Sequence, residues 1–132
     1  MSTTELPDKR QFQRFAMDVP VEVEVLACAA NPELRGRRLQ CQTRDVSLCG
    51  LQLQSAEALP PGTHVGLRVE LRDGDRAVRL KLAGDVIWSN VFPEVGPVAG
   101  VYLRDRPRRH MRRWMDVIGA ELKRQLGAPS AD

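Results

Sequence analysis

VGLRVELRDGDRAVRLKL, residues 65–82, contains two runs of alternating apolar and polar residues on either side of the dipeptide Asp73-Gly74. A period of two places the apolar side chains on one face of a strand and the polar ones on the other. Asp-Gly is favoured in the tight turns that join antiparallel strands. The stretch therefore predicts a β-hairpin with one buried face, whose second strand continues to Val86 and Trp88 through a bend at Gly84.

The same alternation recurs in other parts of the chain. It is found at residues 19–25, 39–43, 51–53 and 99–103. Between these segments, NPELRGRR at 31–38 and SAEALPPGT at 55–63 have the composition of loops, and we expect a further loop to hold Pro93, Gly96 and Pro97. Some six antiparallel strands from one small chain predict an all-β fold, either a barrel or a tight sandwich.

The apolar pattern changes phase between Cys41 and Val46, because apolar residues occupy odd positions before this point and even positions after it. One extra residue in a strand shifts the pattern in this way. We therefore expect a β-bulge near Arg44 or Asp45. Such a bulge would turn the side chains of Asp45 and Ser47 outward together.

Only the C-terminal part of the chain has a helical pattern. Pro107 is well placed at a helix start, and Gly127 and Pro129 would end the run. The apolar residues at helical spacing are Met111, Trp114, Met115, Ile118 and Leu122. We expect this stripe to cover the barrel or to face a second copy of the chain in a homodimer.

Four arginines crowd the first two turns of this helix. They are Arg108, Arg109, Arg112 and Arg113. Cations are unfavourable near the positive end of a helix dipole, so the cluster indicates either an outside anionic partner or a solvated face.

The composition indicates one domain without a membrane segment. A chain of 132 residues, 42% of them hydrophobic, can bury a single core. We expect a cytoplasmic protein, because no apolar run approaches the roughly 20 residues that cross a bilayer and the N-terminus lacks the apolar region of a secretory signal. The cysteines and histidines form no metal-ligand set of the usual spacing. These residues are Cys28, Cys41, Cys49, His64 and His110.

The net charge is +3, and lysine supplies only three of the 20 basic residues. Arginine matches phosphate oxygens and the guanine O6/N7 edge better than lysine does. The bias is compatible with an anionic partner, but a GC-rich genome produces the same bias without selection for binding.

Two short motifs make the chain resemble the PilZ domain family. Arg10-Gln-Phe-Gln-Arg14 is similar to its RxxxR motif, and Asp45-Val-Ser47-Leu-Cys-Gly50 is similar to its (D/N)xSxxG motif. Later stretches also resemble the family's strands, namely PPGTHVGLRVEL, GDVIW and AGVYL. The resemblance covers about residues 9–125. It implies a six-stranded antiparallel β-barrel with a C-terminal helix, and a receptor for the bacterial second messenger cyclic di-GMP.

The resemblance implies a ligand-binding site made of Arg10, Arg14, Asp45, Ser47 and Gly50. Arginines can form bidentate bonds to phosphate or to guanine O6/N7, and a carboxylate can accept hydrogen bonds from the opposite guanine edge. A serine can donate a further bond, and a glycine lets the turn approach the ligand.

Two further residues are weaker candidates. Lys9 stands where the family varies, so the resemblance leaves open whether one or two ligands bind. Trp88 is expected to be buried, or alternatively to offer an exposed edge that stacks on guanine.

We expect three parts in the chain: a flexible N-terminal arm at 1–17, the barrel with its helix at 18–126, and a disordered tail at 127–132. Ligand binding would order the arm, and a partner protein in motility, biofilm or virulence control would recognise the changed surface.

Two alternative functions remain open. One is a PilZ-type adaptor with little nucleotide binding, and the other is a small basic barrel that binds nucleic acid. The second is disfavoured because the chain lacks the aromatic stacking platform of such barrels. An enzyme is not expected, since the sequence shows no nucleophile with a partner base and no set of cofactor- or metal-binding residues.

Overall fold

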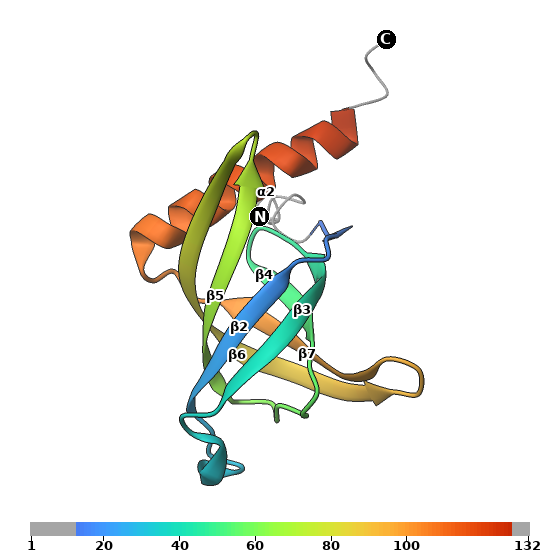
Figure 1. Cartoon of the computed structure of the whole chain (residues 1–132), viewed down its shortest axis with the longest axis vertical. Coiled ribbons are helices and arrows are strands. Elements are labelled where there is room, and N and C mark those ends of the chain that lie inside the picture. Colours follow the sequence, from blue (N-terminus) through green and yellow to red (C-terminus); the bar gives the residue numbers. More distant parts are fainter. Residues whose placement is uncertain (1–12, 128–132) are drawn as a thin grey trace, which may run out of the picture.

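The computed structural model describes residues 13–127. It contains six main antiparallel strands, one additional short strand and a C-terminal helix (Figure 1). These elements are β1 (Phe15–Ala16), β2 (Pro20–Ala27), β3 (Arg38–Val46), β4 (Gly50–Gln54), β5 (His64–Asp73), β6 (Arg76–Phe92), β7 (Gly96–Leu103) and α2 (Arg108–Gly127). The predicted fold class is confirmed.

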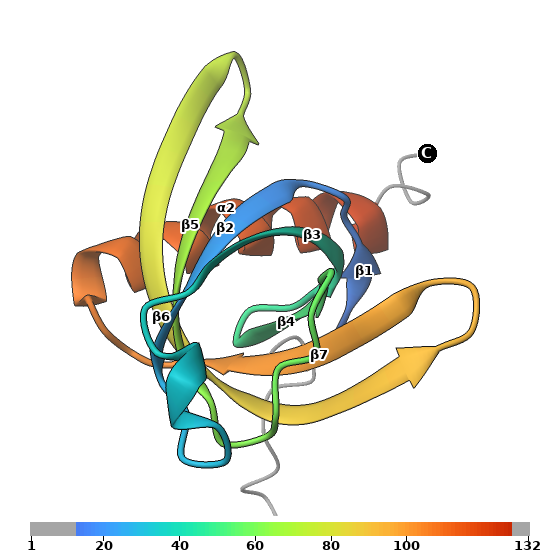
Figure 2. The same cartoon turned by 60° about the horizontal axis from the view of Figure 1, so that its bottom comes forward.

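The barrel closes through pairings between strands that are distant in sequence. The strand order is β3-β2-β5-β6-β7-β4, and a further pairing of β4 with β3 completes the ring (Figure 2). The short β1 joins the end of β3, where Phe15 pairs with Val46 and Ala16 with Asp45. Sequence patterns did not predict β1, because two residues are too few to show an alternation.

The alternating residues line the inside of the barrel as the sequence predicts. The fully buried side chains of the strands include Val21, Val23, Val25, Val46, Leu53, Val65, Leu67 and Val86. The predicted hairpin is present, with Leu71 opposite Val78 and Asp73 opposite Arg76. The burial of these side chains provides the main driving force for the fold.

The predicted bulge is also present. The register of β3 against β4 shifts between Thr43 and Val46. The expected loop around residues 93–97 is shorter than predicted, since Gly96 and Pro97 belong to β7. Pro97 has no N–H to donate, but its carbonyl accepts a hydrogen bond from Ser55 N (3.0 Å). This bond ties the start of β7 to the residue that follows β4.

Helix α2 lies across one end of the barrel, beside the β5–β6 hairpin (Figure 1). Its buried stripe packs against the barrel core and consists of Met111, Trp114, Ile118 and Leu122. The assignment of Met115 to this stripe was wrong, because its side chain is 40% exposed at the edge of the packed face. No helix within residues 13–127 is long and apolar enough to cross a membrane.

Candidate functional site

A pocket with a volume of about 180 Å³ lies at the turn between β3 and β4. We call this the motif pocket, and we call residues 45–50 the motif turn. The residues that line the pocket come from four places in the chain: Arg14, then 45–47 and 49–52, then Ile87 and Trp88, and lastly Gly100, Val101 and Tyr102. The chain segment before β1, the motif turn and the paired strands β6 and β7 therefore meet at one place.

The bulge affects the two polar side chains of the motif turn differently. Asp45 is half-buried and lines the pocket. Ser47 is only 6% exposed, and its hydroxyl donates to the carbonyl of Gly50 (3.3 Å), which also accepts from Ser47 N (2.8 Å). The expectation that both side chains turn outward was wrong for Ser47, because this side chain closes the turn on itself.

Gly50 is required by the barrel itself. A β-carbon at this position would lie 2.8 Å from the backbone oxygen of Val101 on β7, closer than real β-carbons approach other atoms. Gly50 pairs with Tyr102, and the neighbouring Cys49 carbonyl accepts from Leu103 N (2.9 Å). The absence of a side chain thus lets the motif turn pack closely against β7, a reason that the sequence did not reveal.

Trp88 is half-buried and covers Gly100, its cross-strand neighbour. A β-carbon on Gly100 would overlap the indole ring, with Cδ1 at 2.7 Å. Covering a strand glycine with an aromatic ring from the neighbouring strand is a known way to stabilise a sheet. The ring position is therefore set by close packing, and the indole forms one wall of the motif pocket.

Two residues that the sequence analysis did not single out also line the pocket. Tyr102 is 51% exposed and Ile87 is 59% exposed. Ile87 lies within the register shift between Val86 and Trp88, which takes it out of the regular alternation. The sequence signal for Tyr102 was an aromatic residue at an outward-facing position of the strand AGVYL, where the alternation predicts a polar residue.

The arginines of the first motif are only partly covered by the structure. Arg14 is exposed and lines the motif pocket. Arg10 and the weaker candidate Lys9 lie outside the described residues.

Other polar groups lie outside the lining of the motif pocket. Asp85 accepts two hydrogen bonds from the Arg104 guanidinium (2.9 and 3.0 Å) and a further contact from His64, and these partners lower the pKa of Asp85. Burial raises the pKa of the Cys41 thiol. Within residues 13–127, no group of three or more histidine, cysteine or acidic side chains could hold a metal ion.

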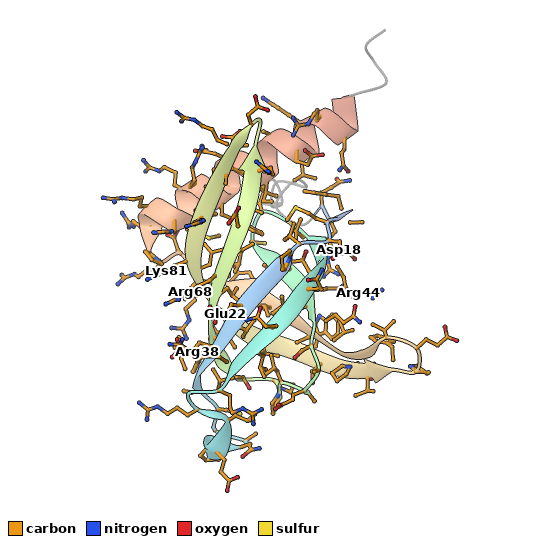
Figure 3. The ribbon with its side chains drawn as sticks, in the orientation of Figure 1. Asp18, Glu22, Arg38, Arg44, Arg68 and Lys81 are labelled. Atoms are coloured by element: carbon orange, nitrogen blue, oxygen red, sulfur yellow. The ribbon has the colours of Figure 1, made fainter. Side chains whose placement is uncertain are left out.

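A larger pocket, about 460 Å³, lies on the outer faces of β2, β5 and β6. Its rim includes Glu22, Arg68 and Lys81, which Figure 3 shows on neighbouring strands. Arg68 and Glu22 approach each other to 3.8 Å. We take the smaller motif pocket as the candidate functional site, because residues of both motifs line it, whereas none of the motif residues that the structure describes lines the larger pocket.

The family model of the PilZ domain matches residues 8–116, which is most of the chain. The chain belongs to the PilZ domain family. PilZ domains are receptor and adaptor domains, and the family includes receptors for cyclic di-GMP. The match spans both motifs and every strand, and it ends within α2.

Solved structures support the same fold. The Bacillus subtilis inhibitor of motility (MotI/DgrA) superposes with a TM-score of 0.64 at 12% identity, covering 86% of this chain and 50% of that chain. This PilZ domain thus spans half the length of that relative. The PilZ domain of CeSA from a cellulose-synthesizing bacterium superposes with a TM-score of 0.53 at 22% identity, covering 83% of this chain and 98% of that one. No curated protein sequence matches the chain.

Proposed function

We propose that this PilZ domain is a cyclic di-GMP receptor that binds its ligand at the motif pocket and signals to a partner protein. The observation that carries the proposal is the convergence of Arg14 and Asp45 on one pocket, with the motif residues Ser47 and Gly50 in the same wall. The arginine comes from before β1 and the carboxylate from the end of β3, so folding has to bring them together.

The chemistry of the pocket suits a guanine nucleotide. The Arg14 guanidinium can bind phosphate or guanine O6/N7 in a bidentate manner. The Asp45 carboxylate can accept hydrogen bonds from the N1 and N2 hydrogens of guanine. Trp88 and Tyr102 offer aromatic surface on which a base can stack. In this assignment Ser47 and Gly50 shape the motif turn, and the turn presents Asp45.

The size of the motif pocket bears on how much of the ligand it encloses. Pockets that enclose a drug-sized ligand have volumes of roughly 300 to 1,000 Å³. The motif pocket, at about 180 Å³, can enclose only part of a cyclic dinucleotide. The remainder would lie over its mouth, where Arg10 is the candidate for the second set of phosphate contacts. Calorimetric stoichiometry would distinguish one bound ligand from two.

Energetics explain why both arginines are expected to matter. A charge-assisted hydrogen bond contributes roughly 1.5 to 3 kcal/mol net, whereas ordering one residue of the arm costs about 1 to 2 kcal/mol. Micromolar affinity corresponds to about 8 kcal/mol, so contacts from the arm and from the motif turn are needed together. Binding would then bring the part of the arm that carries Arg10 onto the motif pocket, and the partner would recognise the changed surface. Faster or unchanged amide exchange in the arm on ligand addition would contradict this step.

The direct test is calorimetry with cyclic di-GMP on matched pairs of variants. Arg10→Ala, Arg14→Ala and Asp45→Asn are each expected to lower binding below detection. Arg44→Ala and Asp18→Asn are the controls and should bind like wild type. Both control residues are exposed and lie near the motif turn, but outside the lining of the motif pocket (Figure 3).

Three results would overturn the proposal. They are wild-type affinity in the two arginine variants, equal losses in the controls, and tighter binding of labelled single-stranded RNA than of cyclic di-GMP by the wild-type chain. The last result would favour the nucleic-acid alternative.

A further inference from the structure

Three arginines of α2 face solvent without an ionic partner. Arg108, Arg109 and Arg112 are exposed, and within residues 13–127 no carboxylate lies within 4.0 Å of their guanidinium groups. Their neighbour Arg113 differs, because its guanidinium bonds to Asp73 on β5 (2.7 Å). We call the three unpaired residues the arginine face.

The fold does not explain the arginine face. The first turn of α2 contains no acidic residue, although acidic residues are the ones that stabilise a helix N-terminus. Arg108 and Arg112 are four residues apart, so their like charges repel across one helical turn. A cluster that costs stability and forms no ion pair within residues 13–127 is available to an outside anion. Its guanidinium forks are suited to bidentate bonds with carboxylates.

The surroundings favour an acidic protein over a nucleic acid or a lipid surface. Asp105 and Asp116 lie on either side of the arginine face in sequence and limit the positive stretch to about two helical turns. A longer track of phosphates would meet these carboxylates and be repelled. Met115 lies one turn beyond Arg112 and is 40% exposed. Arginine and methionine are both enriched at protein interfaces.

The opposite side of α2 is bonded directly to the motif turn. Trp114 is completely buried, and its indole N–H donates to the carbonyls of Leu48 (3.0 Å) and Ser47 (3.3 Å). Gly119 approaches Leu48 one turn later, where an added β-carbon would lie 3.7 Å from Leu48 Cδ2. The motif turn and α2 are therefore in direct contact, without any intervening element.

We propose that the arginine face of α2 is a docking surface for an acidic protein partner, and that Trp114 links the position of this surface to the motif turn. The docking surface stands on the described residues alone. The link to ligand binding rests on the proposed function.

The docking surface can be tested by fluorescence anisotropy with a labelled, glutamate-rich helical peptide. Arg109→Glu/Arg112→Glu should weaken peptide binding by about tenfold or more, since close charge pairs at interfaces have effects of this size. The control is Arg35→Glu/Arg38→Glu, which makes the same charge change at two exposed arginines that also lack ion pairs within residues 13–127. It should stay within about twofold of wild type.

Two outcomes would overturn the docking surface. One is an equal loss in the control variant, which would mean that only net charge matters. The other is tighter binding of a thymidine oligonucleotide or of phosphatidylglycerol vesicles than of the peptide through the same two arginines.

The link is tested by measuring the peptide Kd with and without cyclic di-GMP. Ligand and peptide must change each other's Kd by the same factor, which we expect to be about fivefold in wild type and about one in Trp114→Phe. If cyclic di-GMP still changes the peptide Kd by about fivefold in a folded Trp114→Phe variant, the link is overturned. If that variant fails to fold, amide exchange of Leu48 in wild type replaces it: slower exchange on peptide binding supports the link and unchanged exchange overturns it. Arginine-dependent peptide binding in a protein that fails to bind cyclic di-GMP would refute only the proposed function.

Discussion

Replacing Gly100 with alanine should displace Trp88 from its place in the wall of the motif pocket. The new β-carbon would lie 2.7 Å from Trp88 Cδ1 and overlap the rest of the indole edge. Carbon atoms pack at about 3.5 to 4.0 Å, so the ring has to move by roughly 1 Å or more. The backbones of Trp88 and Gly100 are paired across β6 and β7, which leaves rotation of the ring towards the pocket as the available response.

Overpacking of this kind costs about 1 to 3 kcal/mol in the free energy of unfolding. For a domain of this size the melting temperature should fall by roughly 3 to 12 °C. Circular dichroism measures the loss of stability, and the change in tryptophan fluorescence, to which Trp114 contributes a background, reports the movement of the Trp88 ring. Because the displaced ring would fill part of the pocket, cyclic di-GMP binding should weaken as well.

A double-mutant cycle with Trp88→Ala isolates this effect. Removing the indole removes the clash with the new methyl group. Alanine then costs less than glycine in a strand interior, because it loses less conformational entropy on folding. Gly100→Ala should therefore be neutral or slightly stabilising in the Trp88→Ala background. An equal cost of Gly100→Ala in both backgrounds would refute the packing argument.

Three further predictions follow from other contacts. Asp85→Asn should lower the melting temperature at pH 7, because Arg104 lowers the pKa of Asp85 in the folded state. The stabilisation from Asp85 is present above its ordinary pKa of 3.8 and is lost as the pH falls through the folded-state pKa. The melting temperatures of wild type and variant should therefore converge in acid, and a constant difference would contradict this. Cys49 should be alkylated before Cys41, because the Cys41 thiol is buried and has a raised pKa. Mass spectrometry of partly labelled protein measures the order, and alkylation of Cys41 first would contradict the prediction. Gly50→Ala should reduce stability even without ligand, since the clash is with a β7 backbone oxygen, and a thermal melt that matches wild type would assign the glycine to ligand contact instead.

Local patterns were sufficient to predict most of the fold. The alternation at 65–82 predicts the β5–β6 hairpin, and the phase change after Cys41 predicts the bulge in β3. Both signals are local, because a strand's two faces and its bulges follow from consecutive residues. Met115 was misassigned because helical spacing alone does not determine where the edge of a packed face falls.

The arrangement of the motif pocket was less accessible to such patterns. The motif residues could be recognised by type and order, but Ser47 proved to be buried in its own turn. The role of Gly50 depends on the backbone of Val101, and the attachment of the helix depends on Trp114 reaching the carbonyl of Leu48. These partners are separated by fifty or more residues, and no spacing rule relates them.

By itself the sequence determined the six main strands, the hairpin, the bulge and the amphipathic helix, because each follows from side-chain periodicity over a few neighbouring residues. The tertiary structure decided which strands became neighbours. Closure of the barrel by β4 against β3 and β7 placed the motif turn beside Trp88 and Tyr102, with Arg14 in the same pocket. Packing of α2 on the barrel end then brought Trp114 to the motif turn. Such contacts form only when distant segments bury their apolar faces together, and local periodicity carries no information about that choice.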